Sequence, residues 1–199
     1  SYGTLNDSDG NPFKTRDGST KPLSELFEET YQYIKNINSD LEDSTIKQLA
    51  NSVLTFSDLI TNRKTDYKFD LEKFTNVNGK TGLYVQYAQV RAKKLKQSIG
   101  LQKNEFDLLV LSDIDKHLLS LLFMFGYYLE QSSSLNEPHH LANYLYDISN
   151  SFNQFYEHEK LSEIKDSNHL NSKLYLIDLF LTTSKNVMFC LGIKPVERM

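Results

Sequence analysis

Residues 137–156 read EPHHLANYLYDISNSFNQFY, and this stretch decides the expected fold. Its apolar residues recur at three- and four-residue steps, which places them on one side of a helix with 3.6 residues per turn. Pro138 suits the first turn, where its missing amide hydrogen is not needed. The stretch therefore predicts an amphipathic helix whose buried side consists of Leu141, Tyr144, Leu145, Ile148, Phe152, Phe155 and Tyr156.

Similar periodicity in the rest of the chain predicts further helices, and no segment shows the alternation typical of strands. The apolar run 104–133 is long enough for at least two buried helices, but its charged residues exclude a membrane span. We therefore expect an all-α fold, with other helices after Pro22, from Asp43 to about Thr61, from Leu83 to about Ser98, and from Leu174 to Leu191.

The composition indicates a globular chain of one domain, or one domain with an attached piece. Of its 199 residues, 39% are hydrophobic, which is enough for a core. No signal peptide or membrane span is indicated, so the expected location is the cytoplasm. Cys190 is the only cysteine, which excludes an internal disulfide, and we expect it to be a small buried residue near the end of the last helix.

Positive charge is concentrated in one part of an acidic chain. The formal net charge is −4, yet the thirty-two residues between Glu72 and Glu105 contain no acid and seven basic residues. Tyr84 and Tyr87 lie in this window, and aromatic side chains beside basic ones favour an RNA-binding surface. Two other interpretations stay open. The lysines fit a solvated helix face, and both tyrosines fit core positions.

The sequence contains none of the patterns that usually mark an active site. There is no glycine-rich phosphate loop, no nucleophile with a base, and no HIGH motif of class I synthetases. Adjacent helix positions such as His139 and His140 point about 100° apart. We therefore expect both histidines at the surface of the helix start, and no metal site.

Four segments, in the same order along the chain, resemble arginyl-tRNA synthetases. The first is PFKTR at 12–16 with Gly18, and the second is LYVQYAQVR at 83–91. The third is the stretch at 140–156, which is similar to the LxxYLYxLAxxFNxFY helix of that family's anticodon-binding domain. The fourth is LGIKPVERM at 191–199. The resemblance covers nearly the whole chain.

The resemblance implies an all-α helical bundle of the class I synthetase, DALR-type anticodon-binding kind, preceded by a short loop or hairpin remnant of the catalytic domain. It divides the chain into a catalytic remnant at 1–42, connecting helices at 43–79, and the anticodon-binding domain at 80–199. Lys14 and Arg16 would belong to a KMSKS-like loop that places positive charge on ATP phosphates.

For RNA, the resemblance implies contacts to the anticodon stem-loop from separated places. The expected residues are Tyr84, Tyr87, Arg91, Lys94, Asn153, Tyr156 and Met199. Single-stranded loops offer unstacked bases that aromatic and apolar side chains hold by stacking. The argument for Met199 is that a tail beyond the last helix has little core to support.

The implied function is that of arginine–tRNA ligase, a class I enzyme of protein biosynthesis that uses ATP, with Mg²⁺, and L-arginine. The chain would be a C-terminal fragment and a monomer, binding tRNA-Arg but no cofactor of its own and no membrane. ATP and arginine would bind the absent catalytic domain, so the fragment alone would be inactive. The alternative is a helical protein-interaction module without RNA binding.

Overall fold

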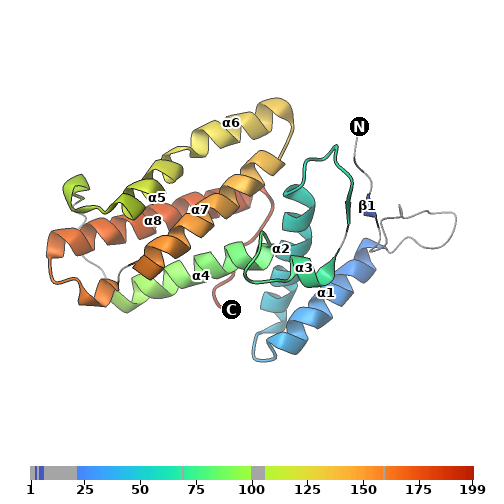
Figure 1. Cartoon of the computed structure of the whole chain (residues 1–199). Helices are drawn as coiled ribbons and strands as arrows, with labels where there is room; N and C mark the ends of the chain where they lie inside the picture. The colour runs from blue at the N-terminus through green and yellow to red at the C-terminus, as the bar shows by residue number, and fades with distance from the viewer. Residues whose placement is uncertain (1–2, 4, 7–21, 69, 100–105, 159) are drawn as a thin grey trace.

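The fold was analysed in a computed structural model that describes residues 3, 5–6, 22–68, 70–99, 106–158 and 160–199. The fold is all-α, as predicted (Figure 1). The described strands are β1 (Leu5–Asn6) and β2 (Tyr67–Lys68), which pair in parallel. Residues 5–6 thus pair with a strand about sixty residues further along the chain, and not with the adjacent strand of a hairpin. Lys14 and Arg16 lie outside the described residues.

The helices fall close to their predicted positions. The central stretch, the segment after Asp43 and the segment after Gly82 each form one long helix. In chain order the helices are α1 (Leu23–Ile37), α2 (Asp43–Leu59), α3 (Leu71–Phe74), α4 (Gly82–Ile99), α5 (Asp113–Phe123), α6 (Phe125–Leu135), α7 (His139–His158) and α8 (Ser167–Cys190), with short 3-10 turns at Leu108–Val110 and Leu161–Glu163.

Helix α7 is the central element of the larger bundle. It packs against α4, α5, α6 and α8 (Figure 1). Six of the seven residues predicted for its buried side are buried, and the ring of Phe152 stacks on Phe180 of α8 at 4.2 Å between centroids. Tyr156 was wrongly placed on that side, because 39% of it is exposed. The Tyr156 ring instead lies at the surface, against the guanidinium of Arg91.

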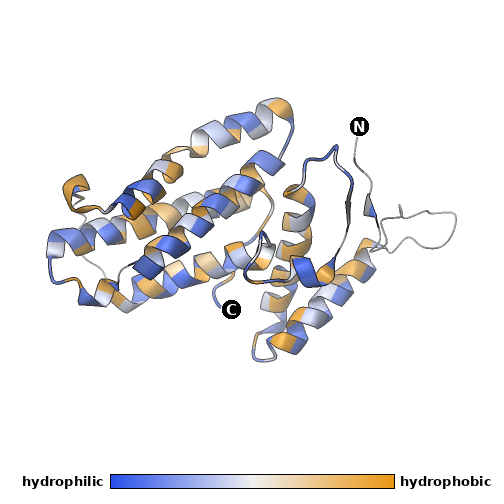
Figure 2. Cartoon of the chain, in the orientation of Figure 1, coloured by the Kyte–Doolittle hydropathy of each residue, from blue (hydrophilic) through white to orange (hydrophobic). Residues whose placement is uncertain are grey.

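Two apolar clusters make up the core. The larger lies between α4, α5, α7 and α8, and the smaller lies between α1 and α2. Helix α4 contributes to both: Val85 and Ala88 belong to the larger cluster, and Leu83 and Val90 to the smaller. Apolar and polar residues intermingle along each helix ribbon, as expected for helices with one buried side (Figure 2).

The start of α4 lies against α2 at very short range. A Cβ atom on Gly82 would lie 2.2 Å from the carbonyl oxygen of Ser52, which is closer than atoms can approach. Only glycine allows the two backbones to come this near. The contact fixes the α1–α2 pair against the first turn of α4.

The apolar run 104–133 forms two helices, as predicted, but it is not buried throughout. Helix α6 has no buried residue, and Leu109 and Phe123 are 92% and 75% exposed. The prediction of two buried helices was therefore wrong for α6. Within the described ranges, no helix combines the length and apolar content that a membrane span needs.

One ion pair lies inside the larger bundle. Lys173 Nζ of α8 is 2.7 Å from Asp115 Oδ2 of α5, and their side chains are 1% and 0% exposed. Ser112 and Asp115 also form a capping box at the start of α5. Asp115 therefore has two roles: it caps the start of α5, and it neutralises the buried Lys173 of α8.

The last helix ends at Cys190, and Gly192 follows with a φ of 72°. This left-handed conformation suits glycine, and the chain beyond it returns toward α4. Cys190 itself is exposed, so the expectation of a buried thiol was wrong.

Candidate nucleic-acid interface

Helices α4 and α7 lie side by side and run in the same direction. The hydroxyl of Tyr84 donates to Asn150 Oδ1 at 3.1 Å, and two turns further on Arg91 Nη1 donates to Asn153 Oδ1 at 3.0 Å. The contacts follow the same order along both helices, although they are seven residues apart in α4 and three apart in α7. The two helices form a surface seam on which side chains of both helices meet.

Arg91 is the centre of this seam. Its guanidinium carbon lies 4.5 Å from the ring centroid of Tyr87 and 4.5 Å from that of Tyr156, so the cation sits between two aromatic rings. Arg91 Nη2 also donates to the Tyr87 hydroxyl at 2.8 Å. Together with the bond to Asn153, these contacts hold the long side chain in one orientation.

The charge of Arg91 is only weakly neutralised. Asn153 and the Tyr87 hydroxyl are neutral acceptors, and the nearest acid is Glu157, at 3.7 Å with a side chain 73% exposed. Solvent screens the attraction of the exposed Glu157 carboxylate, whereas the Arg91 side chain is only 19% exposed. The seam therefore holds a fixed positive group that is partly open to solvent.

A pocket of about 350 Å³ opens beside this guanidinium. Tyr87 and Tyr156, 40% and 39% exposed, provide aromatic surfaces, and Lys94 adds a charge that forms no ion pair within the described part of the chain. A second hollow of about 570 Å³ continues past Tyr156 to Lys160. The residues that line the first pocket are Tyr87, Val90, Arg91, Lys94, Leu95, Ser98, Tyr156 and Met199.

The structure thus brings together five of the seven predicted RNA-binding residues, with Asn153 behind them as a support for Arg91. Asn153 is buried, at 8% exposure. Tyr84 lies apart from the pocket, one turn earlier in α4, and is half-buried. Its ring contacts Tyr146 at 5.3 Å.

Tyr146 and Lys80 were not predicted. Lys80 Nζ lies 4.9 Å from the Tyr146 ring centroid and 3.3 Å from Asn143 Oδ1, so a second aromatic and basic group continues the seam beyond Tyr84. Burial, and the neighbouring Tyr84, raise the pKa of Tyr146. The signal in the sequence was the series Tyr146, Asn150, Asn153, which has helical spacing.

The basic residues of the acid-free window fall on two surfaces. Lys93 Nζ lies 2.8 Å from Glu197 Oε1, and Lys96 pairs with Asp178 of α8. Both lysines thus face the C-terminal tail and α8, away from Arg91 and Lys94. The described part of the window therefore forms no even basic stripe, because Glu197 and Asp178, distant in sequence, neutralise two of its lysines.

Glu137, His139 and His140 gather at the start of α7, with possible ligand atoms within 4.8 Å of one another. Both histidines are half-buried, with rings 4.1 Å apart, so the expectation that they point apart was wrong. Lys64 Nζ lies 3.0 Å from Glu137 Oε1, and the positive end of the α7 dipole lies here. Both features make the binding of a metal cation here less favourable. Burial, separately, lowers the pKa of His139.

A larger groove of about 920 Å³ lies between α1 and α2, but its chemistry differs. Its described lining is mostly apolar and includes the acids Glu28 and Asp58, with no lysine or arginine. Acids there would repel phosphates, so the seam of α4 and α7 is the better nucleic-acid surface.

Comparison with known proteins places this geometry in a family. A model of the DALR anticodon binding domain matches residues 85–199, which include the pocket, the tail and the seam except Lys80 and Tyr84. The fold is thus that of a helical anticodon-binding domain. The chain belongs to the DALR anticodon binding domain family.

Two curated relatives match over the full length of this chain. They are an arginine–tRNA ligase of Alcanivorax borkumensis, 35% identical over 208 residues, and one of Francisella tularensis subsp. novicida, 33% identical over 207. The chain spans 36% of the length of each relative.

Solved structures agree on the fold. An arginyl-tRNA synthetase of Thermus thermophilus superposes with a TM-score of 0.87 over 100% of this chain and 35% of its own, at 23% identity. That of Plasmodium falciparum gives 0.75 over 89% of this chain and 33% of its own, at 26% identity.

Proposed function

We propose that the pocket on the α4–α7 seam holds an unpaired nucleotide of a tRNA anticodon loop. The observation that carries the proposal is the position of Arg91 between the rings of Tyr87 and Tyr156, beside a pocket of about 350 Å³. A base can stack on an exposed tyrosine ring while the fixed guanidinium bonds to its edge or to phosphate. Lys94 then lies beside the path of the backbone.

We further propose that the chain is part of an arginyl-tRNA synthetase. The support is its similarity to arginine–tRNA ligases over its whole length. In that enzyme the RNA would be tRNA-Arg, and ATP with Mg²⁺ and L-arginine would bind in parts that this chain lacks. The same proposal makes the protein a cytoplasmic monomer.

The RNA-binding proposal is tested by fluorescence anisotropy with a labelled anticodon stem-loop of tRNA-Arg. The competitor is the same sequence annealed to its complement, which leaves no unpaired base. We expect the loop to bind and the duplex to compete poorly. Arg91→Ala should weaken binding, whereas Lys116→Ala, which changes an exposed lysine of α5, should not. Equal binding of loop and duplex would contradict the proposed pocket.

The parentage has a separate test. This chain should catalyse no arginine-dependent ATP–pyrophosphate exchange, because the KMSKS-like loop with Lys14 and Arg16 has no nucleotide-binding fold to close over. Exchange above a buffer control would overturn the view that the catalytic core lies elsewhere. If the chain binds no RNA but captures a partner protein, the interaction-module alternative would replace RNA binding.

A further inference from the structure

The C-terminal tail, residues 191–199, reaches the pocket by crossing α4. Ile193 and Val196 are buried, at 3% and 1% exposure, and Met199 forms part of the pocket wall. Among the described residues, the last backbone–backbone hydrogen bond of the tail is that from the Ile193 amide to the Met188 carbonyl, 2.8 Å. The position of Met199 must therefore depend on side chains that bind the tail.

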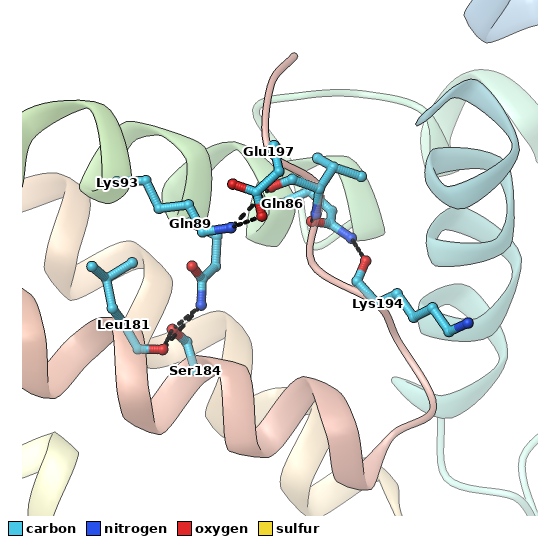
Figure 3. Close-up of polar contacts among 8 residues, drawn as sticks. Gln86, Gln89, Lys93, Leu181, Ser184, Lys194 and Glu197 are labelled. Carbon is cyan, nitrogen blue, oxygen red and sulfur yellow. Dashed lines mark hydrogen bonds and ion pairs between the residues drawn. The ribbon is translucent and has the colours of Figure 1, made fainter. Parts of the chain in front are cut away.

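Gln86 of α4 makes the most complete of these contacts (Figure 3). Its Nε2 donates to the Lys194 carbonyl oxygen at 2.7 Å, and its Oε1 accepts from the Val196 amide at 3.0 Å. The same Nε2 donates to Ser52 Oγ of α2 at 2.8 Å. Gln86 is 0% exposed. Both donors and the acceptor of a buried amide are thus in use, which fixes its geometry.

Other contacts to the tail are weaker because they face solvent. Lys93 Nζ donates to the Val196 carbonyl at 3.4 Å and pairs with Glu197, whose side chain is 83% exposed. Arg198 donates to the Asp40 carbonyl at 3.3 Å in an exposed contact. Exposed ion pairs contribute little to order. Gln86 is therefore the buried contact on which the path of the tail depends.

We propose that Gln86 is a positioning residue for RNA binding, which holds the tail so that Met199 forms one wall of the nucleotide pocket. The inference rests on the proposed function. Gln86 does not line the pocket and does not contact the nucleotide. It acts through residues 194–199.

Gln89 provides a matched control in the same helix. It is also buried, at 1% exposure, and its Nε2 donates to Ser184 Oγ at 2.7 Å and to the Leu181 carbonyl at 3.2 Å, both in α8 (Figure 3). None of its described hydrogen bonds reaches the tail. Gln89→Met and Gln86→Met remove similar buried amides, but only the second releases residues 194–196.

The first measurement is amide hydrogen exchange of this chain. Gln86→Met should speed exchange at Val196, whose amide loses its acceptor, while Gln89→Met should leave that amide protected. Unchanged exchange at Val196 in Gln86→Met would overturn the proposal.

The second measurement is a double-mutant cycle with Met199→Ala, read by anticodon stem-loop affinity. If Met199 supplies one stacking contact, its replacement should weaken binding about 10-fold. Gln86→Met should weaken it by a similar factor, and the double variant by about 10-fold rather than about 100-fold. Gln89→Met with Met199→Ala should show no such coupling.

The outcomes separate the two proposals. If the unmodified chain binds no anticodon loop, the proposed function fails, and the positioning role fails with it. If it binds but the losses from Gln86→Met and Met199→Ala multiply, only the positioning role is wrong. Should Gln86→Met not fold, Gln86→Asn carries the same cycle, because it keeps a buried amide that is one methylene too short to reach residues 194–196.

Discussion

Positively charged side chains have different partners inside the larger bundle and on the outer surface of α4 and α7. Inside the bundle, Lys173 and Asp115 are 1% and 0% exposed and neutralise each other at 2.7 Å. Outside, the short contacts of Arg91 are to neutral groups, the Asn153 amide oxygen at 3.0 Å and the Tyr87 hydroxyl at 2.8 Å, whereas the acid Glu157 lies at 3.7 Å. The difference shows that a charged side chain can be held in one orientation without having its charge neutralised. A cation fixed by neutral partners keeps its charge for a ligand.

The largest expected effect tests the inner side. Asp115→Ala leaves the Lys173 ammonium buried without its carboxylate, so we expect a loss of about 3–5 kcal/mol in the free energy of unfolding. Urea denaturation followed by circular dichroism measures it. Combining Asp115→Ala with Lys173→Met should recover part of the loss. A loss below about 1 kcal/mol would mean that the pair is hydrated.

The next effect tests the outer side. Arg91→Ala should weaken binding of the anticodon stem-loop by about 1–3 kcal/mol, because the fixed cation and the spacer between two tyrosine rings are both lost. Arg91→Lys should recover little, since an ammonium lacks the planar fork. The melting temperature should change little. A loss of stability as large as the loss of binding would instead show that Arg91 has a structural role.

A smaller effect separates free from neutralised lysines. Lys94→Ala should lower the slope of log affinity against log salt by about 0.7–0.9 if Lys94 contacts one phosphate. Lys96→Ala should leave the slope unchanged, because Lys96 is paired with Asp178. Affinity titrations at several salt concentrations provide both slopes. Equal slopes for the two variants would contradict the separation of the two basic surfaces.

The smallest expected effect concerns His139, at the start of α7. Burial, and then the neighbouring His140, lower the pKa of His139 from its ordinary 6.5. The unfolded chain therefore binds this proton more readily, so stability is full above pH 6.5 and falls as pH drops through the lowered pKa. His139→Gln should make the melting temperature less dependent on pH between pH 7.5 and about pH 5.5. His117→Gln, at an exposed position of α5, should not.

Sequence periodicity was sufficient for the long helices α2, α4 and α7 because each one has a buried side. The core of α7 followed directly from the spacing of Leu141, Ile148 and Phe152, all buried. Periodicity failed at two exposed positions. Tyr156 continues the apolar spacing but lies at the surface beside Arg91, and Phe123 stands at the junction of α5 and α6, where it is exposed.

The site was predictable by resemblance but not by composition. Composition grouped Lys93 and Lys96 with Arg91, because their acidic partners Glu197 and Asp178 lie about ninety residues away and cannot be assigned from the sequence. The tail was also misjudged. Met199 packs against the smaller cluster, so it has a structural role beside its place in the pocket. The predicted division at 42 and 79 stays a prediction.

The shared position of α4 has a consequence for how the chain unfolds. Its residues complete both apolar clusters, and Gly82 locks its first turn onto α2. Neither cluster can lose α4 without exposing apolar surface of the other. We therefore expect the α1–α2 pair and the larger bundle to melt in one cooperative transition, although their cores are separate.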